Sequence, residues 1–233
     1  MTEEGADFAP VLADAQRLGY AEADPALDVN GWDAAHKAII LASLAYGFWI
    51  NPADVLVEGI EKVTAADIRF ANELNYRIKL LASIKADEAG EIEVRVVPTL
   101  IPKSHVLASV NGVFNAVAVR GDVVGDALFY GRGAGQDPTS SSVLADLADA
   151  AAFLESPRAC TGFTSHDLYG RCKAIDQTIS KYYLRLGVED RPGVLAQIAG
   201  TLAKADIGIL SVIQPEGLVD GAVPLILTLH DAP

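Results

Sequence analysis

The sequence predicts an α+β protein in which helices cover a largely antiparallel sheet, followed by a smaller βαββ unit. Two pairs of segments alternate apolar and polar residues, 76–86 with 91–100 and 113–119 with 123–130. A short polar turn joins the members of each pair, which is typical of β-hairpins. Segments with helical spacing of apolar residues lie before and after the hairpins, as expected for helices that cover a sheet.

The N-terminal part of the chain predicts two helices separated by a polar segment. Apolar residues recur at helical spacing within residues 8–18, and Gly19 is a typical helix end. Residues 20–31 are polar and contain turn formers, so we expect an extended or turning loop. A second helix is predicted over residues 33–46. Asp33 lies near its start, where a carboxylate interacts favourably with the helix dipole.

The middle of the chain adds short elements around the two hairpins. Residues 55–57 predict a short strand, and Thr64 predicts the cap of a helix that runs to about Leu74. After the second hairpin, the glycine-rich segment 131–135 leads through Pro138 into a helix predicted over residues 139–154.

The C-terminal part predicts a linker and a second unit. Residues 155–180 are weakly patterned and separate a first domain, 1–154, from a unit of residues 181–233. Pro192 is predicted at the first position of that unit's helix, where a missing N–H is tolerated. The unit ends without the last helix and strand of a complete module, so we expect it to be incomplete. Its predicted elements are a strand at 182–188, a helix at 194–205 and strands at 207–214 and 222–230.

Composition excludes several classes of protein. The chain has 233 residues and a formal net charge of −13, which argues against binding nucleic acid or anionic membrane surfaces. The longest predominantly apolar run, 38–50, is too short to span a bilayer, and the first residues lack the features of a signal peptide. Cys160 and Cys172 fit neither a redox pair nor a zinc site, and the four histidines show no metal-ligand spacing. We therefore expect a cytoplasmic protein with no metal and no structural disulfide.

Asp33 and Lys37 form the most informative polar pair. Four residues apart on a helix, they share one face, and such a pair is commonly a solvated surface ion pair. Here the pair opens an apolar helix, and Lys37 is the only lysine in the first sixty residues. A lysine beside a carboxylate at a water-poor helix start can act as a general acid/base or orient a substrate. Glu22, Asp24 and Asp28 could offer acceptors for a substrate ammonium in the same pocket, or could simply form a solvated acidic loop.

Residues 15–37 resemble, in order and spacing, the signature of the homoserine dehydrogenases. Residues 131–143 resemble the second glycine-rich stretch of that family, and residues 182–195 with 211–214 resemble the C-terminal ACT domain of its bacterial members. Essentially the whole chain is covered. The signature positions are Ala15, Gly19, Tyr20, Ala21, Glu22, Ala23, Asp24, Pro25, Asp28, Val29, Gly31, Asp33 and Lys37.

The resemblance implies NAD(P)-dependent interconversion of L-homoserine and L-aspartate 4-semialdehyde, on the route to threonine, methionine and isoleucine. It implies that Lys37 donates and accepts the proton at the substrate oxygen and that Asp33 orients this lysine or its partner water. It further implies that Glu22 binds the amino group of homoserine, and that Asp28 and Tyr20 make further substrate contacts.

The resemblance also implies a cofactor and an effector. Gly135, with Gly133, would lie against the nicotinamide of NADP or NAD, where a Cβ would obstruct the cofactor. Asp190 and Gly193 lie at a strand-to-helix turn that would bind an amino-acid effector such as threonine, with a plain capped turn as the alternative. Separately from the resemblance, long strands with several helices favour a homodimer or higher homo-oligomer, formed through sheet edges or through the ACT domain.

The sequence departs from the family pattern at its start. Family members begin with a dinucleotide-binding domain that carries its own glycine-rich loop and a second active-site lysine. No G-x-G-x-x-G follows a strand near the start of this sequence. We therefore expect this chain to be inactive alone, with the cofactor bound mainly by a domain it does not contain. Two alternatives stay open: a non-catalytic amino-acid-binding or assembly module on the same scaffold, and another two-domain oxidoreductase with a similar second domain.

Overall fold

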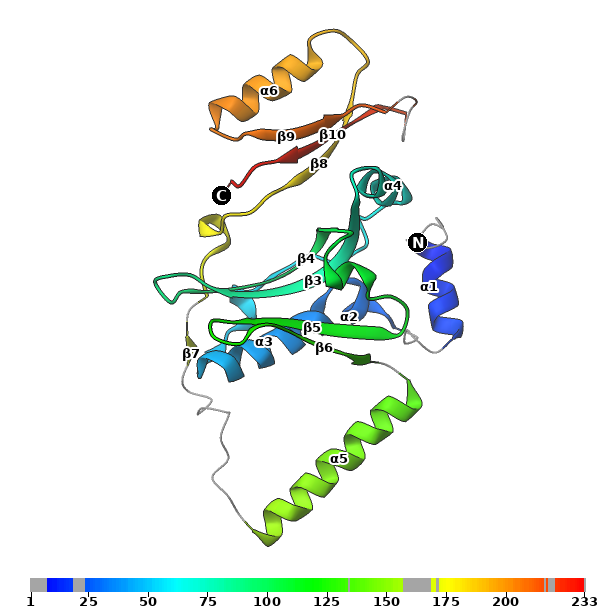
Figure 1. Ribbon diagram of the computed structural model, residues 1–233. Coiled ribbons are helices and arrows are strands. Elements are labelled where there is room, and N and C mark those ends of the chain that lie inside the picture. Colours follow the sequence, from blue (N-terminus) through cyan, green and yellow to red (C-terminus); the bar gives the residue numbers. More distant parts are fainter. Residues whose placement is uncertain are drawn as a thin grey trace.

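The computed structural model describes residues 8–18, 24–133, 135–156, 169–170, 172–215, 217 and 221–232. The described chain has a central body built from sheets and helices (Figure 1). A long helix projects from one side of this body, and a small α/β unit stands on the opposite side. The predicted α+β class is confirmed.

The central sheet has the strand order β2-β4-β3, and β3 and β4 pair antiparallel from Tyr76↔Pro102 to Ala86↔Ile92. The first predicted hairpin is thus confirmed. Helix α3 packs against this hairpin and buries Ala38, Ile39 and Ala42 in a core with Ile92 and Val94 of β4. The elements are α3 (Trp32–Tyr46), β2 (Leu56–Val57), β3 (Tyr76–Ala86) and β4 (Ile92–Pro102).

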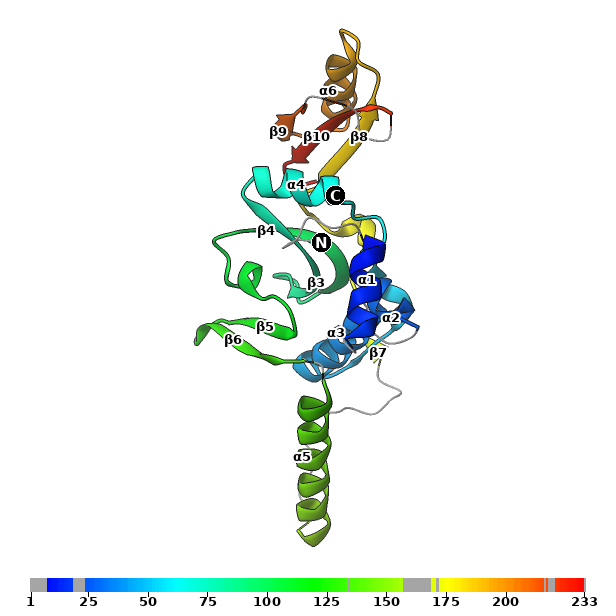
Figure 2. The ribbon, with the colours of Figure 1, turned by 90° about the vertical axis from the view of Figure 1, so that its right-hand side faces the viewer.

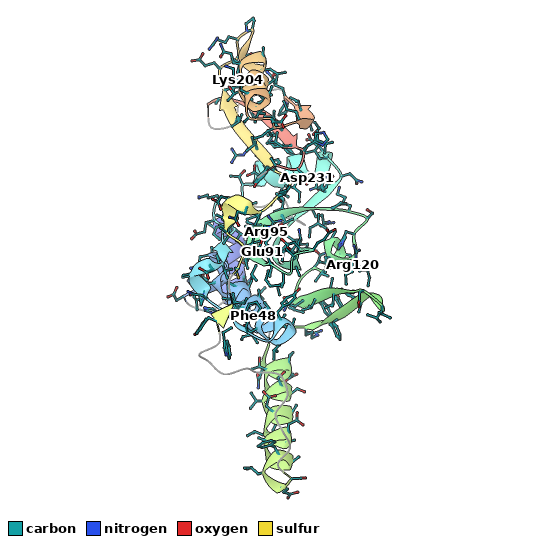
Figure 3. All side chains as sticks on the ribbon, turned by 90° about the vertical axis from the view of Figure 1, so that its left-hand side faces the viewer. Phe48, Glu91, Arg95, Arg120, Lys204 and Asp231 are labelled. Atoms are coloured by element: carbon teal, nitrogen blue, oxygen red, sulfur yellow. The ribbon has the colours of Figure 1, made fainter. Side chains whose placement is uncertain are left out.

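The second predicted hairpin is also confirmed, as β5 (Phe114–Gly121) and β6 (Gly125–Arg132). These two strands form a sheet of their own. At the turn end of the hairpin, the Arg120 guanidinium pairs with the Asp126 carboxylate at 2.6 Å (Figure 3). Large apolar side chains of both strands remain exposed.

Helix α4 (Ala65–Glu73) begins at Thr64, as predicted. The Thr64 hydroxyl accepts a hydrogen bond from the Asp67 N–H, and the Asp67 carboxylate accepts one from the Thr64 N–H. This reciprocal capping box satisfies two backbone donors that the first turn would leave free. The helix packs on β3 and buries Phe70, of which only 1% is exposed.

The N-terminal segment contains α1 (Phe8–Arg17), as predicted, and one element that the sequence analysis missed. Residues 26–29 form a single helical turn, α2 (Ala26–Val29), within the segment expected to be a loop. The Asp24 carboxylate caps this turn by accepting a hydrogen bond from the Ala26 N–H at 3.2 Å. Four residues are too few to show helical periodicity in a sequence.

Helix α5 (Gln136–Glu155) begins earlier than predicted, with Pro138 in its first turn. Backbone N–H groups have no intrahelical acceptor there, so proline is tolerated. The expectation that this helix covers the sheet is wrong for the described chain, because none of its residues is buried. Its side chains extend into solvent along its length (Figure 3).

The segment expected to be a linker, 155–180, joins the central body over its second half. Strand β7 (Tyr169–Gly170) pairs parallel with β1 (Trp49–Ile50), and the Phe48 ring occupies the space that a Cβ at Gly170 would need (Figure 3). The backbone of Cys172 forms an isolated parallel β-bridge with that of Ile92, and the Cys172 side chain packs against the core. The Cys172 thiol is not in a disulfide. Cys160 lies outside the described residues.

The C-terminal unit, defined here as residues 181–232, has the predicted strand–helix–strand–strand order. Its sheet has the antiparallel order β8-β10-β9, and α6 packs its apolar side chains on the central strand. Pro192 is not at the first helical position, because Gly193 caps α6 with a left-handed φ of +92°. The elements are β8 (Tyr183–Val188), α6 (Val194–Lys204), β9 (Ile209–Ile213) and β10 (Val223–Leu229).

None of the helices in the described ranges combines the length and the apolar character that crossing a bilayer requires.

Candidate active site

The start of α3 is built by a tight turn that follows α2. Gly31 caps the helix with φ +86°, and a Cβ at this position would lie 3.2 Å from Val57 and 3.4 Å from Val96. The Asn30 side chain accepts a hydrogen bond from the Trp32 N–H at 3.1 Å. Glycine is required here because the left-handed conformation and the close packing both disfavour a side chain.

Asp33 and Lys37 project from this helix start and are in contact. The Lys37 Nζ donates a hydrogen bond to Asp33 Oδ2 at 2.5 Å. Asp33 and Lys37 therefore lie on the same face of α3, as predicted. The expectation of a water-poor environment is wrong for the described chain, because 68% of the Lys37 side chain and 45% of the Asp33 side chain are exposed.

Two of the three acidic residues expected to meet at this pair lie within the described ranges. Asp24 caps α2 and Asp28 is exposed on that helix. Glu22 and Tyr20 belong to residues 19–23, which lie outside the described ranges. The convergence of Glu22, Asp24 and Asp28 on one pocket stays a prediction.

A residue that the sequence analysis missed, Gly59, supports the turn before α3. The Ile60 N–H donates a hydrogen bond to the Val29 carbonyl at 2.9 Å, which brings this segment against the turn. A Cβ at Gly59 would overlap the Val29 carbonyl oxygen and lie 2.5 Å from the Asn30 Cα. The only sequence signal was a glycine after Glu58, which does not identify the segment that it packs against.

The glycine-rich segment lies between β6 and α5. The Gly133 N–H donates to the Val113 carbonyl at 3.1 Å, and the Asn115 side chain occupies the space where a Gly133 Cβ would stand. Gly135 caps α5 with φ +116°, a conformation that favours glycine, and a Cβ added there would meet only Pro138, at 3.6 Å. The backbone conformation at Gly135 therefore disfavours a side chain, whereas a Cβ at Gly133 would require the exposed Asn115 side chain to move.

An open cleft of about 630 Å³ lies beside Gly135. Arg132 lines it, with its guanidinium 5.6 Å from the centre of the Phe114 ring. The first backbone N–H groups of α5 and the Arg132 guanidinium are the groups in this cleft that suit an anionic ligand. The Asp137 carboxylate, in the first turn of α5, also lines the cleft and adds a negative charge. Strand β6 ends on the side of the molecule where α3 begins (Figure 1).

The turn before α6 contains the predicted effector residues. Asp190 is exposed, and Gly193 caps α6 without any side-chain hydrogen bond. The first N–H groups of α6 therefore have no side-chain cap, as the binding of a carboxylate would need. Across the part of the chain that the structure describes, no three His, Cys, Asp or Glu side chains gather closely enough to hold a metal ion.

Comparison with known proteins identifies the family. The sequence model of homoserine dehydrogenase matches residues 1–148, and that of the ACT domain matches residues 182–214. The chain belongs to the homoserine dehydrogenase family. The homoserine dehydrogenase of Pseudomonas aeruginosa is 47% identical over 240 residues, which cover 99% of this chain and 54% of the relative. That of Neisseria gonorrhoeae is 45% identical, over 98% of this chain and 53% of the relative.

Solved structures of homoserine dehydrogenases agree with this assignment. The enzyme from Thiobacillus denitrificans is 43% identical and superposes with a TM-score of 0.88, over 100% of this chain and 53% of that one. A hyperthermophilic archaeal homoserine dehydrogenase in complex with NADPH gives a TM-score of 0.53 at 30% identity, over 67% of this chain and 43% of that one. The family is NAD(P)-dependent. The chain spans about half the length of the curated relatives it matches.

Proposed function

We propose that this chain forms the substrate-binding part of a homoserine dehydrogenase, which interconverts L-homoserine and L-aspartate 4-semialdehyde with NADP or NAD. The observation that carries the proposal is the contact between Lys37 and Asp33 at the start of α3, within the residues that match the family. The exposure of both side chains fits a site that is completed by the part of the relatives that this chain does not span. A cytoplasmic location stays a prediction.

The proposed chemistry assigns a proton relay to Lys37. When bound, NAD(P) supplies the hydride acceptor or donor. During reduction the aldehyde oxygen gains negative charge, and the Lys37 Nζ donates a proton to it; during oxidation Lys37 takes the hydroxyl proton back. The Asp33 carboxylate holds the Lys37 ammonium on one face of α3 through the 2.5 Å hydrogen bond. Glu22, Asp28 and Tyr20 bind the ammonium end and the remainder of the amino acid.

The residues at the glycine-rich segment fit a nucleotide cofactor. Gly135 has no Cβ to fill the approach to the cleft, and Arg132 places a positive charge at its wall. We assign Gly133 and Gly135 to the contact with the nicotinamide half of the cofactor. Gly135 lines the cleft, where a side chain would narrow the approach, and Gly133 lies two residues before it. Which of NADP or NAD is preferred depends on residues outside this contact.

The activity is tested with a chimaera that joins this chain to the part of the Pseudomonas aeruginosa relative that it does not match. We expect NADP or NAD reduction, followed at 340 nm, that depends on L-homoserine. This chain alone and the relative itself are measured beside the chimaera. A folded chimaera without homoserine-dependent reduction would contradict the proposal and favour a non-catalytic amino-acid-binding or assembly module.

We propose that the turn before α6 binds the carboxylate of an amino-acid effector such as threonine. The support is the ACT match and the uncapped N-terminus of α6 at Gly193. Titration calorimetry with L-threonine is expected to show saturable binding, and D-threonine is the control. Replacing Asp190 by alanine is expected to weaken the affinity about tenfold if its carboxylate holds the effector ammonium. Absence of saturable heat with the unmodified chain would refute the effector site.

We propose that the chain forms a homodimer through the β5–β6 hairpin. A two-stranded hairpin is marginally stable by itself, and this one exposes a set of large apolar side chains that a partner would cover. Val117 and Phe129 are paired in register and are 44% and 67% exposed. Val119 is exposed on the same face of the hairpin, and this is the face that we propose the partner covers. Leu128 and Tyr130 are exposed on the opposite face.

The dimer is tested by light scattering coupled to size-exclusion chromatography. We expect Phe129→Glu to convert the dimer to a monomer, because the charge would have to be buried between the two copies. Val123→Glu is the matched control, since this turn residue is 93% exposed and lies outside the paired strands. A monomeric unmodified chain, or a dimer that tolerates Phe129→Glu, would show that the hairpin serves another purpose.

A further inference from the structure

A buried carboxylate joins the C-terminal unit to the central body. Asp67, at the third position of α4, is only 6% exposed. Its Oδ1 accepts hydrogen bonds from the Tyr183 hydroxyl at 2.8 Å and from the Arg185 Nε at 2.6 Å. Both donors belong to β8. Figures 1 and 2 show α4 directly beneath the strands of the C-terminal unit.

The same carboxylate also fixes the start of α4. Asp67 Oδ2 accepts hydrogen bonds from the Thr64 N–H at 2.9 Å and from the Thr64 hydroxyl at 2.6 Å. Burial raises the pKa of Asp67, but the hydrogen bonds from Thr64, Arg185 and Tyr183 together outweigh burial and hold that pKa below its ordinary value of 3.8. Asp67 is therefore a charged acceptor at neutral pH, and a charged acceptor makes the stronger hydrogen bonds.

The segment before Thr64 leads directly to the candidate active site. The Val63 N–H donates to the Ile60 carbonyl at 3.0 Å, and the Ile60 N–H donates to the Val29 carbonyl at 2.9 Å. Gly59 packs against the backbone of Val29 and Asn30. Because Gly31 follows at once and begins α3, a displacement of residues 58–64 would displace the helix start that carries Asp33 and Lys37.

We propose that Asp67 is a positioning residue that fastens β8 to α4 and, through residues 58–64, holds the turn that begins α3. The contacts run from Tyr183 to Asp67, from Asp67 to Thr64, and from the adjoining Val63 through Ile60 to Val29. We expect this chain of hydrogen-bonded segments to carry a displacement from one end to the other. A change in the C-terminal unit thereby reaches Lys37. The effect on Lys37 rests on the proposed function, whereas the positioning of α4 and of the turn before α3 does not.

The path is tested by hydrogen exchange on the full chain, with the change made on the side of the C-terminal unit. Tyr183→Phe deletes one hydroxyl and leaves Asp67 and its cap in place. Tyr182→Phe, which deletes the same group one residue earlier on an exposed side chain, is the matched control. We expect about tenfold faster exchange at the Ile60 and Ala35 amides in Tyr183→Phe, as for the loss of one hydrogen bond to a charged group.

Amide exchange in the hydrophobic core shows whether Tyr183→Phe loosens only the proposed path or destabilises the whole chain. The amide of Val94, a buried residue of β4, should exchange as in the unmodified chain, as should all amides in Tyr182→Phe. Faster exchange confined to β8 and α4, or no change at Ile60 and Ala35, would overturn the proposal.

A second pair of variants tests the carboxylate itself. Asp67→Asn keeps the size of the side chain and removes its charge. Glu73→Gln makes the same change at an exposed residue, the last of α4. In the chimaera, we expect Asp67→Asn to lower kcat about tenfold with little change in KM, and Glu73→Gln to leave both unchanged. An unchanged kcat in an active chimaera would contradict the consequence for Lys37. If the chimaera has no activity, the proposed function fails while the exchange experiment still decides the positioning role.

Discussion

Replacing Lys37 by alanine is expected to reduce homoserine turnover by the chimaera by a factor of about 10²–10⁴, the usual contribution of a general acid/base. The loss should appear in kcat, because the proton is needed at the substrate oxygen only as the hydride moves. Folding should be unaffected, since 68% of the Lys37 side chain is exposed and its ion pair with Asp33 lies at the surface.

Steady-state kinetics and thermal unfolding of the same preparations check this prediction. Lys204→Ala is the matched control, because Lys204 is an exposed lysine at the end of α6, outside the segments that we propose position Lys37. Asp33→Asn should give a smaller loss, since it keeps the side chain but weakens the hold on the Lys37 ammonium. A Lys37→Ala protein with near-normal turnover would remove Lys37 from the mechanism.

Replacing Gly59 by alanine is expected to destabilise the chain by about 1–3 kcal/mol, the range for overpacking a close contact. The new Cβ would overlap the Val29 carbonyl oxygen, and backbone atoms cannot move aside as a flexible side chain can. The segment must therefore shift away from the turn before α3. We expect the hydrogen bond from the Ile60 N–H to Val29 to lengthen and the turnover of the chimaera to fall.

Urea unfolding of this chain measures the loss of stability, with Gly200→Ala as the control. Gly200 lies inside α6 with nothing within 4 Å of its Cβ position, so alanine there should be neutral or stabilise by up to about 1 kcal/mol. Equal stability of the two variants would show that the close approach at Gly59 relaxes without cost.

Local patterns predicted most of the elements of this fold. The period of two in residues 76–102 and 114–132 determined both hairpins, because alternate side chains of a strand face opposite sides of the sheet. The spacing of Asp33 and Lys37 on a helix determined their contact. Thr64 predicted the start of α4, because its hydroxyl caps a backbone N–H within the same turn.

Features that depend on distant segments were not predicted. The pairing of β7 with β1 and the packing of Cys172 on Ile92 join segments far apart in the sequence, and two-residue strands show no period. The exposure of Lys37 was also missed, since an apolar run beside a lysine shows which face of the helix is buried but not what covers its polar face.

The sequence by itself therefore determined both hairpins and the longer helices, the family resemblance and the pairing of Lys37 with Asp33, all of which depend on local patterns of residues. The tertiary structure alone decided that α5 stands free of the sheet and that Gly59 packs on the turn before α3. It also brought Tyr183 and Arg185 to Asp67 across separations of 116 and 118 residues. Each of these contacts closes a loop of more than a hundred residues. A contact between residues so far apart produces no repeating pattern in the sequence, so the sequence did not predict it.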